Sequence, residues 1–171
     1  MTPQGFSISA VAFAPSGLLV YVLTNSQILT VPVWGNATLA LAGLASISGS
    51  CSGCGFADGQ GTAARFSNAS GLVVHPVTGV VYIADSDNFR IRTCTATGLV
   101  ATLAGSGTIG NVDGAASTAT FNGPFGIVMD SANQYIYVTC KSGGTLRQVD
   151  VTAGFTTTLV SGLSSPTYEI K

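Results

Sequence analysis

An internal repeat of about 55 residues constrains this chain more than any other feature of its sequence. The stretch "DGQGTAARFSNASGLVVHPVTGVVYIADS" (58–86) aligns with "DGAASTATFNGPFGIVMDSANQYIYVTCK" (113–141). Phe66 falls on Phe121 and Tyr82 on Tyr137, each pair 55 positions apart, and Asp58-Gly59 and Gly71 fall on Asp113-Gly114 and Gly126. Such a repeat predicts a structural unit that buries its apolar surface against copies of itself.

A third copy lies upstream, and a fourth begins at the end of the chain. "AVAFAPSGLLVYVLT" (10–24) aligns with "GLVVHPVTGVVYIAD" (71–85), and "LALAG" (39–43) aligns with "ATLAG" (101–105). The extra length around "SISGSCSGC" predicts an inserted connection over 44–57. The last residues, "SSPTYEIK", resemble the start of another copy, so 163–171 are interpreted as a truncated fourth repeat.

Each copy is predicted to form four short antiparallel strands. In the middle copy these are "GLVVHP", "VVYIAD", "RIRTCT" and "LVATLAG", separated by turn-forming stretches. The first two strands are apolar on both faces, as in strands packed between layers, whereas Arg90 and Arg92 indicate a third strand nearer the rim. The predicted fold class is all-β, a β-propeller segment with blades over about 8–43, 71–105 and 126–162.

Residues 55–107 resemble an NHL repeat, the unit of NHL-type six-bladed β-propellers. The resemblance lies in D-G-x-G-x-x-A-x-F, a Y-hydrophobic-A-D stretch, N-x-R-I-R and T-L-A-G, and it extends with less agreement over about 150 residues. The third copy departs from it, with Cys140 in place of Asp85 and "GGTLR" in place of "NFRIR". The resemblance implies a propeller without implying an activity, because such propellers serve as binding platforms and in some relatives as enzymes.

The composition limits the classes of partner. Charged residues make up 8% of the chain, against about 25% in an ordinary soluble domain. No basic cluster predicts nucleic-acid or membrane-surface binding, and Pro15, Ser16 and Gly17 interrupt the longest apolar run, so no membrane insertion is predicted. Low charge, Ser/Thr richness, the "CSGC" pair and two sequons favour an extracellular or cell-surface protein. Its secretory signal is not predicted within this chain.

Two motifs resemble ligand sites, and we interpret both as structural. "GSGTIG" (105–110) has the spacing of a dinucleotide fingerprint, but the repeat places it in a connection between blades rather than before a helix. "DSDNFRIRTCTA" (85–96) begins like a calcium loop but has Arg90 at the sixth position and Ala96 at the twelfth. A hairpin is predicted there, in which Asp85 meets Arg90. No cofactor and no metal site is predicted.

Four residues are candidates for contacts with a ligand on a loop face: Asp58, Asp113, His75 and Asp130. The main interpretation of the two Asp-Gly pairs is structural, with Asp capping the turn that follows and Gly supplying a positive φ. The sequence has a single histidine and no G-x-S-x-G elbow, so no catalytic residues are assigned.

The cysteines and sequons give covalent expectations. Cys51 and Cys54 are predicted to form a local disulfide, with a redox motif or half of a zinc site as alternatives. Cys94 takes the place of Val149 in the next copy, which predicts a buried thiol. Asn36 and Asn68 stand in Asn-X-Ser/Thr triplets and are predicted N-glycosylation sites.

The function expected from the sequence is a non-catalytic, NHL-like interaction module that binds protein or glycan. The alternative is part of a propeller enzyme of the lyase, lactonase or hydrolase kind. Closed propellers have about four to eight blades, so three blades leave two apolar faces uncovered. Either missing blades of a parent chain or a two-fold partner is therefore expected to close the ring.

Overall fold

The structure is a computed structural model, and it describes residues 7–17, 19–24, 26–32, 45–49 and 55–164. The described residues form strands and two short 3₁₀ helices, η2 (Gly61–Ala63) and η3 (Ser86–Asn88), with no α-helix among them. The predicted all-β class is therefore confirmed.

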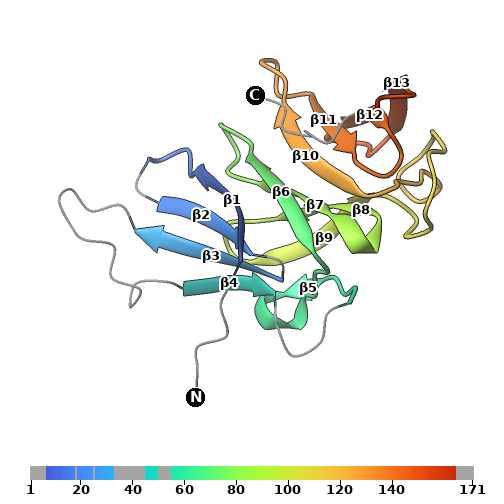
Figure 1. The fold of residues 1–171 in the computed structure, drawn as a ribbon. Helices are drawn as coiled ribbons and strands as arrows, with labels where there is room; N and C mark the ends of the chain where they lie inside the picture. Colours follow the sequence, from blue (N-terminus) through green and yellow to red (C-terminus); the bar gives the residue numbers. More distant parts are fainter. Residues whose placement is uncertain (1–6, 18, 25, 33–44, 50–54, 165–171) are drawn as a thin grey trace.

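The strands form three antiparallel sheets, one for each copy of the repeat (Figure 1). In each sheet, consecutive strands pair in sequence order, which is the meander expected of a propeller blade. The first blade contains β1 (Ile8–Phe13), β2 (Leu19–Thr24), β3 (Gln27–Pro32) and β4 (Ala45–Gly49). The second contains β6 (Ala69–Val74), β7 (Val81–Asp85), β8 (Arg90–Cys94) and β9 (Leu99–Ala104), with β5 (Gly59–Gln60) added beside β9. The third contains β10 (Pro124–Met129), β11 (Tyr135–Cys140), β12 (Thr145–Asp150) and β13 (Thr156–Val160).

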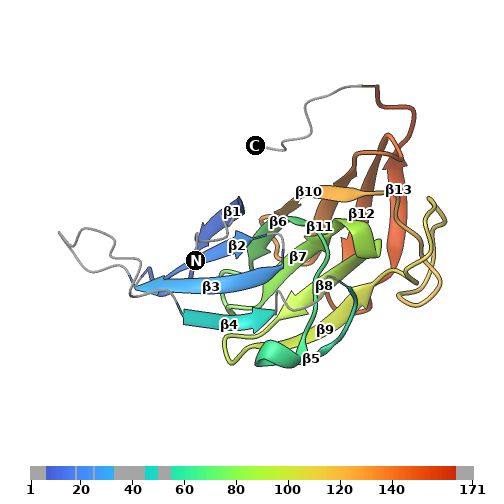
Figure 2. The ribbon, with the colours of Figure 1, turned by 60° about the horizontal axis from the view of Figure 1, so that its bottom comes forward.

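The blades lie side by side and contact one another mainly through their first strands. β6 packs against β1 on one side and β10 on the other, as the two views of the ribbon show (Figures 1 and 2). One core cluster joins the first two blades around Leu23, Phe66 and Ile83, and a second joins the last two around Tyr82, Phe121 and Ile136. Phe66 and Phe121 are both fully buried between blades, as the repeat predicted.

The repeat is visible in the strand register. Leu72 pairs with Ile83 in the second blade, and the equivalent Ile127 pairs with Val138 in the third. In the first blade the equivalent pair is Val11 and Val22. Because side chains alternate between the two faces of a strand, the three equivalent pairs lie on the same face of their respective blades.

The outer strand of the first blade differs from the expected one. Sequence alignment placed it at 39–43, but β4 spans Ala45–Gly49 and pairs with β3, inside the stretch predicted to be an inserted connection. Alternation is weak in this Ala-, Gly- and Ser-rich segment, so the alignment could not fix the register. Residues 33–44 lie outside the described part of the chain, and so do 165–171 of the predicted fourth repeat.

Candidate functional site

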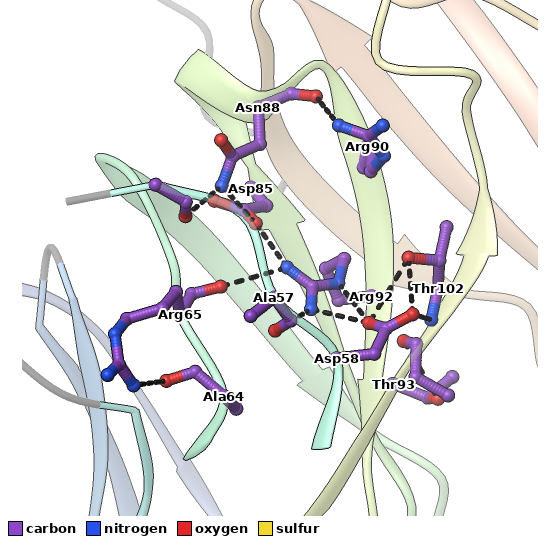
Figure 3. Close-up of polar contacts among 12 residues, drawn as sticks. Ala57, Asp58, Ala64, Arg65, Asp85, Asn88, Arg90, Arg92, Thr93 and Thr102 are labelled. Carbon is purple, nitrogen blue, oxygen red and sulfur yellow. Dashed lines mark hydrogen bonds and ion pairs between the residues drawn. The ribbon is translucent and has the colours of Figure 1, made fainter. Parts of the chain in front are cut away.

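A buried arginine is the centre of the most extensive polar network in the second blade (Figure 3). Arg92 on β8 is fully buried, which corrects the expected position near the rim. Its Nη1 donates to Asp85 Oδ2 at 2.7 Å, and its Nη2 donates to Asp58 Oδ1 at 2.6 Å. The connection that precedes the blade covers this strand and supplies two further acceptors, the carbonyls of Ala57 (2.7 Å) and Arg65 (3.1 Å). A buried guanidinium needs such a set of acceptors, because unpaired donors there would be costly.

Asp85 lies at the end of β7 and is fully buried. Besides Arg92, it accepts hydrogen bonds from the backbone N–H of Ser67 and the side chain of Asn88, both at 2.8 Å. Burial raises the pKa of Asp85, against the opposing effect of Asn88, Ser67 and Arg92. The predicted hairpin is present, and Asp85 and Arg90 pair in its strand register. The carboxylate of Asp85 binds Arg92, however, because the guanidinium of Arg90 donates to the carbonyls of Asn88 and Ser106 instead.

The sequence had indicated that Asp58 caps the turn that follows it, and the structure shows that it does not. Its carboxylate instead accepts hydrogen bonds from the backbone N–H and hydroxyl of Thr102 on β9, and from Arg92. The adjacent Gly59 has φ of +148°, and Gly114 in the next copy has φ of +140°, so the predicted positive φ is confirmed at both positions. The Asp-Gly pair thus attaches the connection to the outer strand of its blade.

The third blade repeats this network with one carboxylate fewer. Arg147 is fully buried, and its Nη2 donates to Asp113 Oδ1 at 2.9 Å. The carbonyls of Thr120 (2.8 Å) and Val112 (3.0 Å) take the places of those of Arg65 and Ala57. Partial burial raises the pKa of Asp113, but hydrogen bonds from Thr158 and the charge of Arg147 outweigh it and hold this pKa below its ordinary value.

Cys140 occupies the place of Asp85 in the third blade. The thiol is buried, and burial raises its pKa. Cys94 is also buried and lies in the core between the first two blades, as predicted. Cys51, Cys54 and Asn36 lie outside the described residues, so the disulfide and the first glycosylation site stay predictions. Asn68 is described; it is exposed and directly precedes β6, so the second glycosylation site also stays a prediction.

A second arginine joins a hairpin to the following connection. The guanidinium of Arg90 stacks on the ring of Phe56, 3.8 Å from its centroid. It donates to the carbonyls of Asn88 (2.9 Å) and Ser106 (2.8 Å) and lies against Gly107, where a Cβ would collide with it. Gly107 therefore has a packing role in the connection from β9 to β10. No helix begins at Gly110, so the glycine-rich stretch lacks the helix that a dinucleotide fingerprint needs.

His75 and Asp130 lie in equivalent hairpin turns, after β6 and β10. His75 Nδ1 accepts from the backbone N–H groups of Val77 and Thr78, each at 3.2 Å. Asp130 Oδ1 accepts from those of Gln134 (2.8 Å) and Tyr135 (3.0 Å). The structure therefore does not bring the four candidate residues together: two stabilise hairpin turns, and Asp58 and Asp113 lie along the outer strands.

The antiparallel topology gives the blades two different ends. One end carries the β7–β8 and β11–β12 hairpins and the long connections between blades, and we call it the connection face. Three large apolar side chains are exposed on these connections: Phe56 (46%), Ile109 (58%) and Val112 (59%). Sequence reasoning missed them, because a residue in a connection has no strand alternation to predict its exposure.

The described part of the chain contains no group of three or more His, Cys, Asp or Glu side chains that could hold a metal ion. Nor does it contain a helix with the length and apolar character needed to cross a membrane. The ionisable side chains of the two networks bond chiefly to each other and to backbone carbonyls. The role that this arrangement supports is structural: the two networks bind the connections to the strands of the blades.

Comparison with known proteins shows the fold. No protein-family model matches the chain, and no curated protein matches it. An auxiliary nutrient binding protein from Bacteroides thetaiotaomicron has 28% sequence identity and a TM-score of 0.67 over 78% of this chain and 35% of its own. A second, from Bacteroides ovatus, has 28% identity and a TM-score of 0.66 over 81% and 36%. A catalytically inactive virginiamycin B lyase from Staphylococcus aureus has 13% identity and a TM-score of 0.61 over 98% and 45%.

This chain spans about a third to a half of the length of these solved chains. Together with the three antiparallel sheets, two of four strands and one of five, the matches show that it has the fold of part of a β-propeller.

Proposed function

We propose that this chain is a non-catalytic, NHL-like β-propeller interaction module that binds protein or glycan through its connection face. The observation that carries the proposal is the exposure of Phe56, Ile109 and Val112 on that face. Contiguous apolar patches on a protein surface often mark sites that bind partners. The blades beneath the connections provide a rigid support for them.

The two arginine networks support this proposal, because they fix the connections that carry the apolar side chains. Val112 is held through its carbonyl by Arg147, and Ala57, next to Phe56, is held by Arg92. Arg90 adds a stack on Phe56 and a hydrogen bond to Ser106, three residues before Ile109. A surface whose backbone is fixed in this way loses little conformational entropy on binding.

The similarity to two nutrient binding proteins at 28% identity also favours a binding role. The lyase shares 13% identity, which bears on the fold alone. We further propose that the chain belongs to a larger extracellular or cell-surface protein, on the basis of its low charge and its two sequons.

Binding of the purified chain to an array of oligosaccharides and an array of secreted protein domains tests the proposal. We expect saturable binding to a member of either array, lost in Ile109→Asp and kept in Val77→Asp. Val77 is 80% exposed in the β6–β7 hairpin, at the other end of the blades, so it is a matched apolar-to-acidic control. Turnover of lactone, phosphomonoester or glycan substrates without such binding would instead support the enzyme alternative.

A further inference from the structure

The outer strands of the second and third blades lack the residues that usually protect the edge of a sheet. β9 reads "LVATLA" and β13 reads "TTTLV", and neither contains a charged residue or a proline. Leu99, Leu159 and Val160 in these strands are 48%, 46% and 41% exposed. A strand of this composition at a sheet edge is prone to pair with a strand of another chain, because its outward N–H and C=O groups have no partners within the sheet.

The connection before each blade covers part of this edge through backbone pairing. Gly59 in β5 pairs with Val100, and the N–H of Gly61 donates to the carbonyl of Gly98 at 2.9 Å. In the third blade, the N–H of Gly114 donates to the carbonyl of Thr156 at 3.0 Å, and the N–H of Thr156 donates back at 2.8 Å. The outward backbone groups at the beginning of both outer strands therefore have partners.

In the second blade, a carboxylate covers the next outward position of the edge. Alternate residues of an antiparallel strand direct their backbone groups to the same side, so the next outward N–H after that of Val100 belongs to Thr102. This N–H donates to Asp58 Oδ2 at 3.2 Å, and the hydroxyl of Thr102 donates to the same oxygen at 3.1 Å (Figure 3). The carboxylate thus binds the N–H to which a carbonyl of an added strand would bind.

The third blade has the same arrangement. The hydroxyl of Thr158 donates to Asp113 Oδ1 at 2.7 Å. Partial burial raises the pKa of Asp113 and both the N–H and the hydroxyl of Thr158 lower it, which indicates that both groups lie beside the carboxylate. The Asp-Gly pair is present in both copies, although Asp85 of the same network is replaced by Cys140 in the third blade. The cover of the edge is therefore kept where the rest of the arginine network changes.

We propose that the two Asp-Gly pairs protect the outer edges of the blades against pairing with strands of other chains. The glycine backbone binds the first outward position, and the aspartate carboxylate binds the next. The side chains of Asp58 and Asp113 are 42% and 45% exposed, so a strand that approached this edge would have to displace a solvated carboxylate. An ionised carboxylate only accepts hydrogen bonds, so it cannot continue the ladder as a backbone would. This inference does not rest on the proposed binding function.

Two double variants test the protection, because they differ in one property. Asp58→Ala with Asp113→Ala and Asp58→Asn with Asp113→Asn both remove the ion pairs with Arg92 and Arg147, but only the asparagines keep a side-chain oxygen for the outward N–H. Sedimentation velocity at neutral pH, over a range of protein concentrations, measures self-association. We expect the concentration for half-association to fall about 10-fold or more in the alanine variant. The asparagine variant should associate no more than the parent.

Removal of the outward N–H itself provides the decisive measurement. Thr102→Pro and Thr158→Pro, added to the alanine variant, delete the two N–H groups that the carboxylates cover, and proline is tolerated where its nitrogen faces away from the sheet. Association should return to that of the parent, with an unchanged circular dichroism spectrum. Equal association of the alanine and asparagine variants, or association that persists with the prolines, would overturn the proposal.

Loss of stability alone is controlled by Arg92→Met. This substitution removes the cationic partner of Asp58 and Asp85 but leaves the bonds from Thr102 to Asp58. We expect it to lower the midpoint of urea unfolding without an increase in self-association. If association instead follows the loss of stability in Arg92→Met and the alanine variant alike, then unfolding causes it, and the carboxylates do not protect the edge.

Discussion

Asp85 and Cys140 occupy the same place in consecutive blades. Each is the last residue of the second strand of its blade, and each pairs with the first residue of the innermost strand, Ala69 for Asp85 and Pro124 for Cys140. In the second blade, the carboxylate binds Arg92, Asn88 and the N–H of Ser67. In the third, Arg147 relies on Asp113 and two carbonyls. The two blades therefore allow a comparison between a buried arginine that binds two carboxylates (Arg92) and one that binds a single carboxylate (Arg147).

Replacing Asp85 with the residue of the third blade should destabilise the protein. Asp85→Cys removes an acceptor from Arg92, Asn88 and Ser67, and we expect the free energy of unfolding to fall by about 1–3 kcal/mol. Urea unfolding at neutral pH measures this loss. In the background Asn88→Gly, which reproduces Gly143 of the third blade, the loss should be smaller because one donor no longer needs the carboxylate. Equal losses in both backgrounds would show that Asn88 and Asp85 are not coupled.

Removing the two arginines should have unequal effects. Arg92→Met leaves the fully buried Asp85 without its cationic partner, and breaking such a pair costs about 3–5 kcal/mol. Arg147→Met leaves Asp113, whose side chain is 45% exposed and stays solvated. We expect the second substitution to cost less by about 1 kcal/mol or more. Thermal unfolding of both variants in the same buffer checks the order, and equal losses would show that the burial of the carboxylate has no effect.

The two aspartates should contribute to the pH dependence of stability with opposite signs. The folded pKa of Asp113 is lowered, so its contribution is present at neutral pH and is lost as the pH falls below about 3.9. The folded pKa of Asp85 is raised, so the part of its contribution that depends on protonation is fully present below about 3.9 and is lost as the pH rises through the raised value, while its hydrogen bonds remain.

Urea unfolding of three proteins measures these contributions: the parent, Asp113→Asn and Asp85→Asn. The measurements run from about pH 2.5 to about pH 7, a range that includes the ordinary pKa of a carboxyl group. The advantage of the parent over Asp113→Asn should grow with pH, and its advantage over Asp85→Asn should shrink. Slopes of the same sign for both would contradict the assignment.

The contact between the second and third blades should be sensitive to one added methyl group. A Cβ at Gly71 on β6 would collide with the carbonyl oxygen of Phe125 on β10, which belongs to the backbone and cannot move alone. We expect Gly71→Ala to lower the free energy of unfolding by about 1–3 kcal/mol. Gly55→Ala is the matched control, because nothing lies within 4 Å of its Cβ position. Equal stability of the two variants would show that the blades can separate without cost.

Sequence alone determined the units of this fold. The 55-residue register predicted the strands of the second and third blades, because strand alternation and turn residues are local properties. It also predicted that Phe66, Phe121 and Cys94 are buried. It misplaced the outer strand of the first blade, where the Ala-, Gly- and Ser-rich segment gives little alternation to align.

The tertiary structure decided the roles of the charged residues. Arg92 alternates along β8 like a residue near the rim, and it is buried because a connection more than 25 positions earlier in the sequence covers it. Asp58 resembled a turn cap, but a strand over 40 positions later supplies its N–H partner. A local sequence pattern shows the two-residue alternation of a strand. It does not show which side chain from a distant segment will pack against that strand and bind its residues. For that reason the sequence located the blades, and only their packing showed which side chains bind each other and which faces stay uncovered.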